Sequence, residues 1–208
     1  MKIYPMTVGP VQTNCYILSK DKNAVVIDPG ESARKIIHYL ESNQLKLQSV
    51  ILTHGHFDHV GAVNQLVEKF PVPIFAHRRE REYFFSEDVN LSRQFGTPYT
   101  LKQNLDFQWV GEGTVLDVLG ETVIPLHIPG HTPGSLAYYF KEEGVVFTGD
   151  VLFSGSIGRT DFIYGNGPLL LSGIRSSLLI LPPQTVVYSG HGPATTIEIE
   201  STTNRFLI

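Results

Sequence analysis

The sequence has little cysteine, little net charge and no long apolar run. Its single cysteine, Cys15, cannot form an intramolecular disulfide, which fits a reducing cytoplasm without requiring one. A formal charge of −4 leaves no general basic field to attract nucleic acid or anionic lipid. No apolar run is long enough to span a membrane, and Pro5 and Pro10 interrupt the N-terminus too early for a signal peptide. We expect a cytoplasmic protein without nucleic-acid or membrane partners.

The composition is that of a folded protein. Hydrophobic residues make up 42% of the 208 positions, which is enough apolar surface to offset the entropy lost on folding. No internal repeat, low-complexity tract or linker divides the chain. We therefore expect a single domain over residues 1–208, a length at the upper end of what one domain usually holds.

Apolar segments of two kinds alternate along the chain. Short runs rich in β-branched and aromatic residues predict strands at residues 15–18, 24–27, 50–52, 73–75, 122–128, 136–140, 145–147 and 185–188. Helical spacing predicts helices at residues 32–41, 62–70 and 169–179, with Ser32 as a candidate N-cap of the first. Residues 86–109 show no sustained period and form either a loop over a site or an ordinary surface excursion. A layered α/β protein is the expected class.

The densest chemical signal directly follows the predicted strand at residues 50–52. His54, His56 and His59 lie within six residues, together with Asp58. Imidazoles packed this closely are costly without a metal, because each needs a partner and they repel one another when protonated. Zinc takes nitrogen and carboxylate ligands, and a turn between strand and helix can direct neighbouring side chains toward two ions. The motif predicts a metal site.

Four further aspartates and histidines also follow apolar strands. They are Asp28, His131, Asp150 and His191, and each stands beside a glycine or one residue from it along the chain. Ligands of layered α/β proteins gather at one edge of the sheet, where strands end and glycine lets the backbone approach closely. We expect these residues to join the histidine motif at that edge.

Together these five segments resemble the ordered motifs of the metallo-β-lactamase superfamily and extend over nearly the whole chain. The resemblance implies a four-layer αββα sandwich, in which two sheets pack face to face with helices outside. It implies two divalent metal ions, most simply zinc, although the same ligand types accept iron or manganese. The implied ligands are His54, His56 and His131 for the first metal and Asp58, His59 and His191 for the second, with Asp150 bridging.

Residues 158–162 and 191–196 are similar to the small glyoxalase II branch of that superfamily, the hydroxyacylglutathione hydrolases. This resemblance implies a small-molecule thioester substrate such as S-lactoylglutathione. Two metal ions about 3.5–4 Å apart lower the pKa of a shared water to about 7, which supplies hydroxide at neutral pH. A thiolate, with a parent pKa near 8.5, leaves without a strong general acid. Asp58 is a candidate proton relay besides its ligand role.

Other functions stay open at this stage. Full-length glyoxalase II has a C-terminal helical domain that binds glutathione, and we expect none here because the chain ends at Ile208, soon after His191. A related branch, the persulfide dioxygenases, binds one iron through residues matching His54, His131 and Asp150. A lactonase, and a metal-binding protein without turnover, are further alternatives. The sequence does not indicate the oligomeric state.

The remaining polar residues have weaker assignments. Asp28 is expected to support a metal-bound histidine, or else only to form a turn before Pro29. Arg159 and Asp161 form either a structural ion pair near the site or, through Arg159, a contact to an anionic substrate. Structural roles are expected for the other histidines and for Cys15 as a buried, inert thiol. These histidines are His38, His77 and His127.

Overall fold

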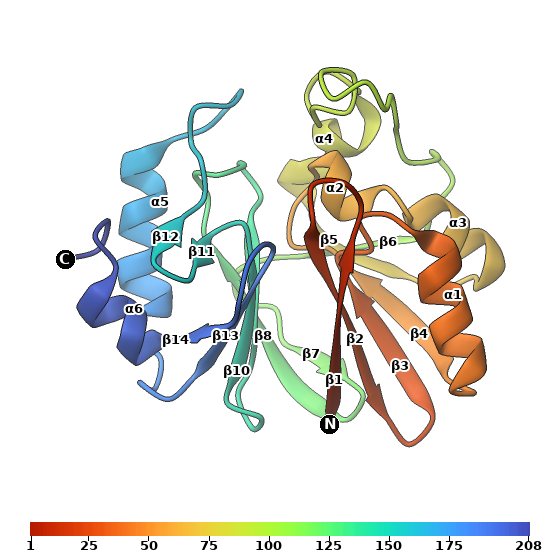
Figure 1. Ribbon diagram of the computed structural model, residues 1–208, viewed down its shortest axis with the longest axis horizontal. Coiled ribbons are helices and arrows are strands. Elements are labelled where there is room, and N and C mark those ends of the chain that lie inside the picture. Colours follow the sequence, from red (N-terminus) through yellow and green to blue (C-terminus); the bar gives the residue numbers. More distant parts are fainter.

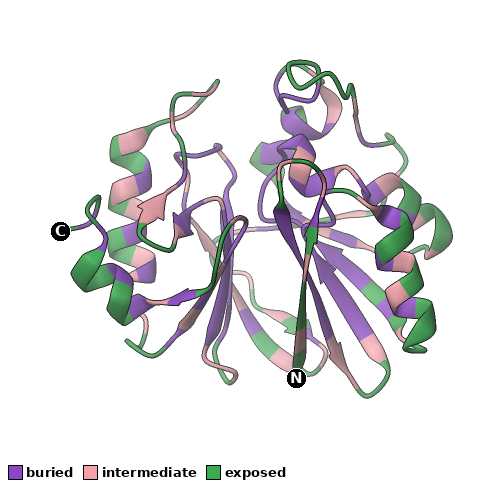
Figure 2. Cartoon of the chain, viewed as in Figure 1, coloured by how far each residue is buried: buried purple, intermediate pink, exposed green.

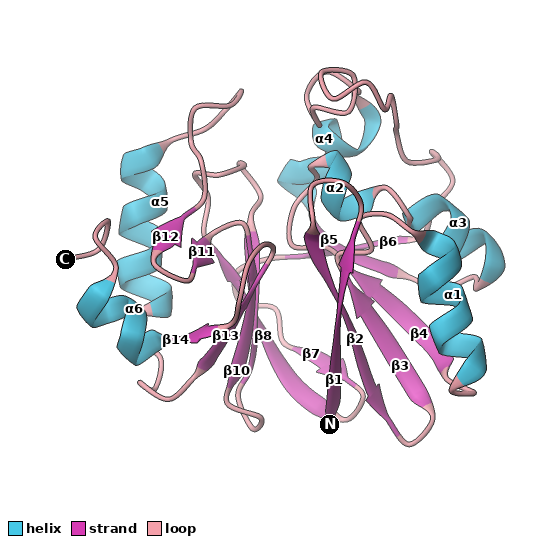
Figure 3. Cartoon of the chain, in the orientation of Figure 1, coloured by secondary structure: helices cyan, strands magenta, loops and turns pink.

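Two six-stranded sheets pack face to face in the computed structural model, which describes residues 1–208 (Figure 1). Helices cover the outer face of each sheet, so the chain has four layers in the order helix, sheet, sheet, helix (Figure 3). The predicted αββα sandwich is confirmed. No helix is both long enough and apolar enough to cross a bilayer.

The first sheet is built from the N-terminal half of the chain. In spatial order its strands are β1 (Lys2–Val8), β2 (Thr13–Lys20), β3 (Asn23–Ile27), β4 (Lys46–Ile51), β5 (Ile74–His77) and β6 (Phe107–Val110). The pairs β1–β2 and β2–β3 are antiparallel, whereas β3 to β6 run parallel. The carboxyl ends of β3, β4 and β5 therefore lie at one edge of the sheet.

The second sheet is built from the C-terminal half. Its spatial order is β14 (Thr195–Thr196), β13 (Val186–Ser189), β10 (Val145–Gly149), β9 (Leu136–Phe140), β8 (Glu121–His127) and β7 (Leu116–Val118). The pair β10–β13 is parallel, and the other pairs are antiparallel. A small hairpin of β11 (Leu152–Phe153) and β12 (Ser156–Ile157) follows β10.

Three apolar layers hold the sandwich together. Because successive side chains of a strand point to opposite faces, Ile17 and Val26 pack under the helices of the first sheet, while Leu18 and Ile27 face the second sheet. The third layer lies between the second sheet and its helices, and Val146 and Ile174 both belong to it. Strands buried on both faces have continuous apolar sequences. Strands β9 and β10 are of this kind, and Figure 2 shows the central strands as mostly buried.

Six α-helices complete the chain: α1 (Ala33–Ser42), α2 (Phe57–Val60), α3 (Val63–Lys69), α4 (Arg81–Phe85), α5 (Gly167–Gly173) and α6 (Ile197–Thr203). Helices α1 and α3 cover the first sheet, and α5 and α6 cover the second (Figure 1). In α1 the buried residues Ala33, Ile36 and Leu40 recur at helical spacing on the face turned to the sheet. A 3-10 turn, Arg78–Glu80, leads into α4.

All eight predicted strands and all three predicted helices are present, and all but the strand at residues 136–140 have shifted ends. Some local predictions were wrong. Ser32 does not cap α1 through its side chain, because its backbone is left-handed (φ 59°) and makes no side-chain cap bond. The third predicted helix is α only to Gly173 and continues as a π-helical turn, Ile174–Leu178. Residues 107–109, placed in an irregular segment, belong to strand β6.

Candidate metal centre

The predicted site residues converge at the edge where the strands end. Asp28 follows β3, the histidine motif follows β4, and Asp150 follows β10. His131 lies beyond the end of β8, and His191 beyond the end of β13. The site therefore lies between the two sheets and receives side chains from both. This arrangement is the one that the strand-end pattern predicted.

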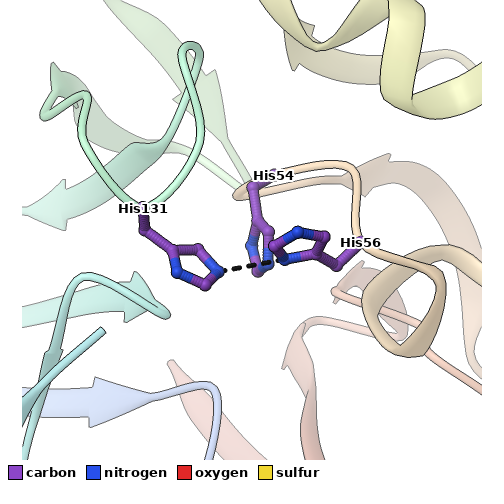
Figure 4. Close-up of side chains that lie close together, drawn as sticks. All are labelled: His54, His56 and His131. Carbon is purple, nitrogen blue, oxygen red and sulfur yellow. Dashed lines mark hydrogen bonds between the residues drawn. The ribbon is translucent and has the colours of Figure 1, made fainter. Parts of the chain in front are cut away.

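His54, His56 and His131 form a first triad of imidazoles. One nitrogen of each lies within 4.8 Å of the others, and all three side chains are buried. His56 Nδ1 lies 3.0 Å from His131 Nε2, and Figure 4 shows the three rings pointing toward one another. Two of the rings come from the loop after β4 and the third comes from the opposite sheet.

Asp58, His59 and His191 form a second triad. Asp58 Oδ2 lies 3.3 Å from His191 Nε2 and 3.5 Å from His59 Nε2. Asp58 and His59 sit in the short helix α2, which starts immediately after His56, so the chain passes from the first triad to the second within three residues.

Asp150 lies between the two triads. Its Oδ1 is 3.3 Å from His59 Nε2, and its Oδ2 is 3.5 Å from His191 Nε2 and 3.7 Å from His131 Nε2. One carboxylate thus faces imidazoles of both triads, as a residue bridging two metal ions must.

Several buried polar atoms of the triads and of Asp150 have no hydrogen-bond partner. They are Nε2 of His54, His56 and His59, together with Oδ1 of Asp150. In His56 the other nitrogen, Nδ1, is the one that lies toward His131. Buried polar atoms are nearly always paired, because an unpaired one costs about 1–3 kcal/mol. Unpaired imidazole nitrogens and carboxylate oxygens that face one another are the donor set that divalent metals take, so the residues present fit a metal centre.

Asp28 supports the second triad from behind. Its Oδ1 accepts a hydrogen bond from the Thr53 backbone N–H (2.8 Å), and its Oδ2 accepts one from the Thr53 hydroxyl (2.6 Å). The same Oδ2 lies 2.9 Å from His59 Nδ1. Although Asp28 lies near His54 and His59, its oxygens are already occupied, so the geometry favours a supporting role over a ligand role.

Replacing Asp28 by asparagine should weaken metal binding by about 10–100-fold. With its Oδ1 accepting from the Thr53 N–H, the new amide NH₂ would donate to His59 Nδ1 and force the tautomer that carries its proton on Nε2. That tautomer cannot bind a metal through Nε2. Competition titration with a chelator measures the change, with the exposed Asp106→Asn as the matched control. Unchanged affinity in Asp28→Asn would show that Asp28 does not orient His59.

The N-terminal strand β2 contributes supports that the sequence did not reveal. The Thr13 hydroxyl donates to Asp58 Oδ2 at 2.7 Å. Asn14 Nδ2 donates to the carbonyls of Ser189 (3.1 Å) and Gly192 (2.8 Å), which flank His191, and the Tyr16 hydroxyl donates to the Ser189 carbonyl (2.6 Å). The available signal was a cluster of polar residues at the start of an otherwise apolar buried strand.

Arg159 supports the site through its backbone. Its carbonyl lies 2.7 Å from His131 Nδ1, which leaves Nε2 of that ring free to face Asp150. The side chains of Arg159 and Asp161 form an ion pair, one of the two roles expected from the sequence, with 2.7 Å between Arg159 Nη2 and Asp161 Oδ2. Both are 65% exposed, so the pair adds little stability. The guanidinium also lies over the Phe162 ring.

A groove of about 450 Å³ lies beside the first triad. It is lined by residues of segments 88–94 and 159–163, and the Phe162 ring is 5.6 Å from the His56 ring. The carbonyl of Asn90 accepts a hydrogen bond from the Phe57 N–H at the start of α2. Segment 86–106 therefore contacts both the groove and the metal-binding loop. Of the two predictions for this segment, these contacts favour a loop beside the site over an ordinary surface excursion.

The two triads differ in their protonation. Burial is the largest cause that lowers the pKa of His54, His56 (to about 3) and His131. For His191, burial alone would lower the pKa, but Asp150 and Asp58 outweigh it and raise it to about 9. Nearby aspartates raise the pKa of His59 in the same way. The first triad is thus neutral at pH 7, whereas the apoprotein's second triad carries protons.

This difference predicts an order of metal loading. The first equivalent should enter the neutral triad with almost no proton release, whereas the second must displace protons from His59 and His191. Between pH 8 and pH 6 the second equivalent should lose about tenfold in affinity per pH unit for each proton displaced. Calorimetric titration in two buffers of different ionisation enthalpy counts those protons. Equal pH dependence of both equivalents would contradict the assignment.

The pKa of Asp58 is shifted in the opposite direction to the pKa values of His59 and His191. Burial raises the pKa of Asp58, but the charge of His59 and hydrogen bonds from His191 and Thr13 outweigh it and lower the pKa to about 2. A carboxylate this acidic keeps its charge at neutral pH and accepts protons poorly. Of the two roles predicted for Asp58, its lowered pKa favours metal ligand over proton relay.

The residues outside the centre behave largely as expected. Cys15 is fully buried, and burial raises the pKa of its thiol far above its usual range, so it is unreactive. His38 is on the surface beside Ser42. His77 and His127 were expected to have structural roles, and their rings stack at 4.2 Å across the two sheets.

Comparison with known proteins gives close relatives over the whole chain. A hydroxyacylglutathione hydrolase, GloC of Haemophilus influenzae, is 41% identical over 209 residues, covering 100% of this chain and 98% of that protein. A probable metallo-hydrolase, YqgX of Bacillus subtilis, is 39% identical over 212 residues with the same coverage.

Solved structures agree with these relatives. BLEG-1, a B3 metallo-β-lactamase, superposes with a TM-score of 0.94 at 42% identity, with 99% of each chain covered. TTHA1623 in a di-iron-bound form gives 0.87 at 37% identity, covering 98% of this chain and all of that one. ETHE1 from Myxococcus xanthus gives 0.80 at 27% identity, covering 99% and 84%.

The family model completes the comparison. It matches residues 8–191, a span that starts before Thr13 and ends on the last predicted ligand, His191. All seven predicted ligands and Asp28 lie inside that span. The fold, the convergent strand ends and this match agree, and the chain belongs to the metallo-β-lactamase superfamily of metal-dependent hydrolases.

Proposed function

We propose that this protein is a two-metal hydrolase that cleaves a small thioester of the S-lactoylglutathione type. The observation that carries the proposal is the pair of triads joined by Asp150. In this proposal His54, His56 and His131 hold the first ion, and Asp58, His59 and His191 hold the second. Zinc is the proposed metal, because imidazole and carboxylate ligands suit it.

Two divalent ions bound there would supply an activated water and a Lewis acid for the acyl oxygen. The protein's own part is to hold the donors in place. Asp28 and Thr13 orient His59 and Asp58, the Arg159 carbonyl orients His131, and Asn14 holds the loop that carries His191. The catalytic role of Asp150 is to place one negative charge between the two groups of ligands.

A thioester suits this site better than an ester or amide, because a thiolate leaves without protonation. Asp58 and Asp161 are poorly suited to protonate a leaving group at neutral pH, because the pKa values of both are lowered. The 41% identity to a hydroxyacylglutathione hydrolase favours the glutathione thioester, and the groove beside Phe162 has room for such a substrate.

A single-iron dioxygenase is the second candidate, because the same ligand types accept iron, and iron is bound in the 37% identical TTHA1623. That chemistry needs only His54, His131 and Asp150 as ligands, so it leaves the second triad without a purpose. Here the second triad is complete, and Asp28 and Thr13 hold it in place. These supports favour two metals.

One pair of assays separates the two candidates. The purified protein is loaded with zinc or with ferrous iron and is given S-lactoylglutathione or glutathione persulfide. We expect hydrolysis of the thioester by the zinc form and no oxygen uptake with the persulfide. Oxygen uptake by an iron form with one metal per chain, without thioester hydrolysis, would replace the proposed function with the dioxygenase.

A further inference from the structure

Glu80 is a fully buried glutamate to which the sequence analysis assigned no role. Its side chain is 0% exposed, although it follows two arginines at the end of the 3-10 turn Arg78–Glu80. Burial raises the pKa of Glu80 to about 7, against hydrogen bonds from Thr132, Gly134 and Gly55 that lower it. Charged residues are rarely buried this completely unless their partners require it.

The partners of Glu80 belong to two different ligand loops. Its Oε2 accepts a hydrogen bond from the Gly55 N–H at 2.7 Å, and Gly55 stands between His54 and His56. Its Oε1 accepts one from the Gly134 N–H at 2.6 Å, three residues after His131. The two loops follow β4 and β8, which belong to opposite sheets. A single carboxylate therefore joins the loops that carry all three imidazoles of the first triad.

Both bonded residues are glycines, and the structure shows why. A Cβ at Gly55 would lie 3.1 Å from Glu80 Oε2 and 2.4 Å from Tyr83 Cβ. A Cβ at Gly134 would lie 2.7 Å from Glu80 Oε1. The absence of side chains at these positions lets the carboxylate reach each N–H, so the two glycines and Glu80 form one fitted arrangement.

The following residues extend this arrangement. The Tyr83 ring contacts the His56 ring edge-on at 5.3 Å, and its hydroxyl donates to the Ile163 carbonyl at 2.9 Å. The loops are also joined by a backbone bond from Leu136 N to the Thr53 carbonyl (2.9 Å). Glu80 adds a second link, which fixes the rotation of the loops about that bond.

We propose that Glu80 is a positioning residue that sets the spacing and orientation of His54, His56 and His131 for metal binding. It touches neither metal nor substrate and acts through the backbone of Gly55 and Gly134. The inference rests on the ligand assignment of the proposed function. Its effect is expected to be largest at the first metal site, because Gly55 and Gly134 stand next to the imidazoles of that triad along the chain.

The test compares Glu80→Gln and Glu80→Ala with the wild type by cobalt titration of the apoprotein. Glutamine keeps the size and one acceptor but turns an NH₂ toward a backbone N–H, so one of the two links is lost. We expect the first-site affinity to fall by about 10–100-fold in Glu80→Ala and by less in Glu80→Gln. The visible cobalt absorption of the first equivalent should also change in shape, which a loss of stability alone would not cause.

Glu200 offers a matched control. It is also 0% exposed and accepts hydrogen bonds from Thr195, Gly155 and Asn204, none of which lies in a ligand loop. Glu200→Gln should lower the unfolding temperature while keeping the wild-type cobalt spectrum. Wild-type cobalt affinity and spectrum in folded Glu80→Gln would overturn the inference. A wild type that binds no cobalt would instead overturn the proposed function.

Discussion

Replacing Asp150 by alanine is expected to abolish the second metal site and to lower thioester hydrolysis by at least about 100-fold. Asp150 faces imidazoles of both triads, with contacts of 3.3 to 3.7 Å. Without it, His59 and His191 lose one of the carboxylates that face them, and the two groups of ligands are no longer joined. Metal content after gel filtration and the hydrolysis rate measure the two effects in the same sample.

The matched control for this variant is Asp106→Ala. Asp106 is exposed just before β6, and its side chain accepts a hydrogen bond from Gln108. It should keep two metals and full activity. Two tightly bound metals together with undiminished hydrolysis in Asp150→Ala would show that the bridging role is misassigned.

Replacing Gly190 by alanine is expected to have a comparably large effect from a single added methyl group. A Cβ at Gly190 would lie 2.1 Å from Asp150 Oδ1 and 2.6 Å from His59 Cε1. These contacts are closer than atoms tolerate, so the carboxylate and the imidazole must move away from the added methyl group. We expect loss of the second metal and of most hydrolysis, at an overpacking cost of about 1–3 kcal/mol in stability. Zinc stoichiometry and thermal unfolding of the apoprotein measure the two.

Gly192 provides the control within the same loop. Its backbone is left-handed (φ +75°), and a Cβ there meets no atom within 4 Å. Gly192→Ala therefore adds backbone strain of about 1–2 kcal/mol without touching the centre. It should lose stability but keep both metals. If both variants kept two metals and activity, the close packing of Gly190 against the centre would have no functional meaning.

The layers of the fold and the candidate ligands could be predicted from local patterns. Continuous apolar runs such as residues 136–140 identify strands buried on both faces, and they are buried throughout in the structure. Because parallel strands direct their carboxyl ends to one edge, Asp28, Asp150 and His191 could be expected to meet the histidine motif. The structure brings them together, and their roles as ligands stay a prediction until metal is measured.

The supports of the site could not be predicted in the same way. Thr13 and Asn14 act across 45 and 175 positions of the chain, and such pairings leave no periodic signal. Glu80 lies in the charged segment 78–82 that is typical of a surface, yet it is buried because two loops from opposite sheets supply its donors. Strand β1 was missed because Pro5 and exposed residues interrupt its apolar pattern.

The most direct test of a two-metal hydrolase is a zinc titration of the apoprotein, with bound metal and thioester hydrolysis measured in each sample. We predict little hydrolysis after the first equivalent, because that ion fills the neutral triad of His54, His56 and His131. Hydrolysis should then rise with the second equivalent and stay constant beyond it. Full hydrolysis at one equivalent, or in metal-free protein, would contradict the two-metal centre.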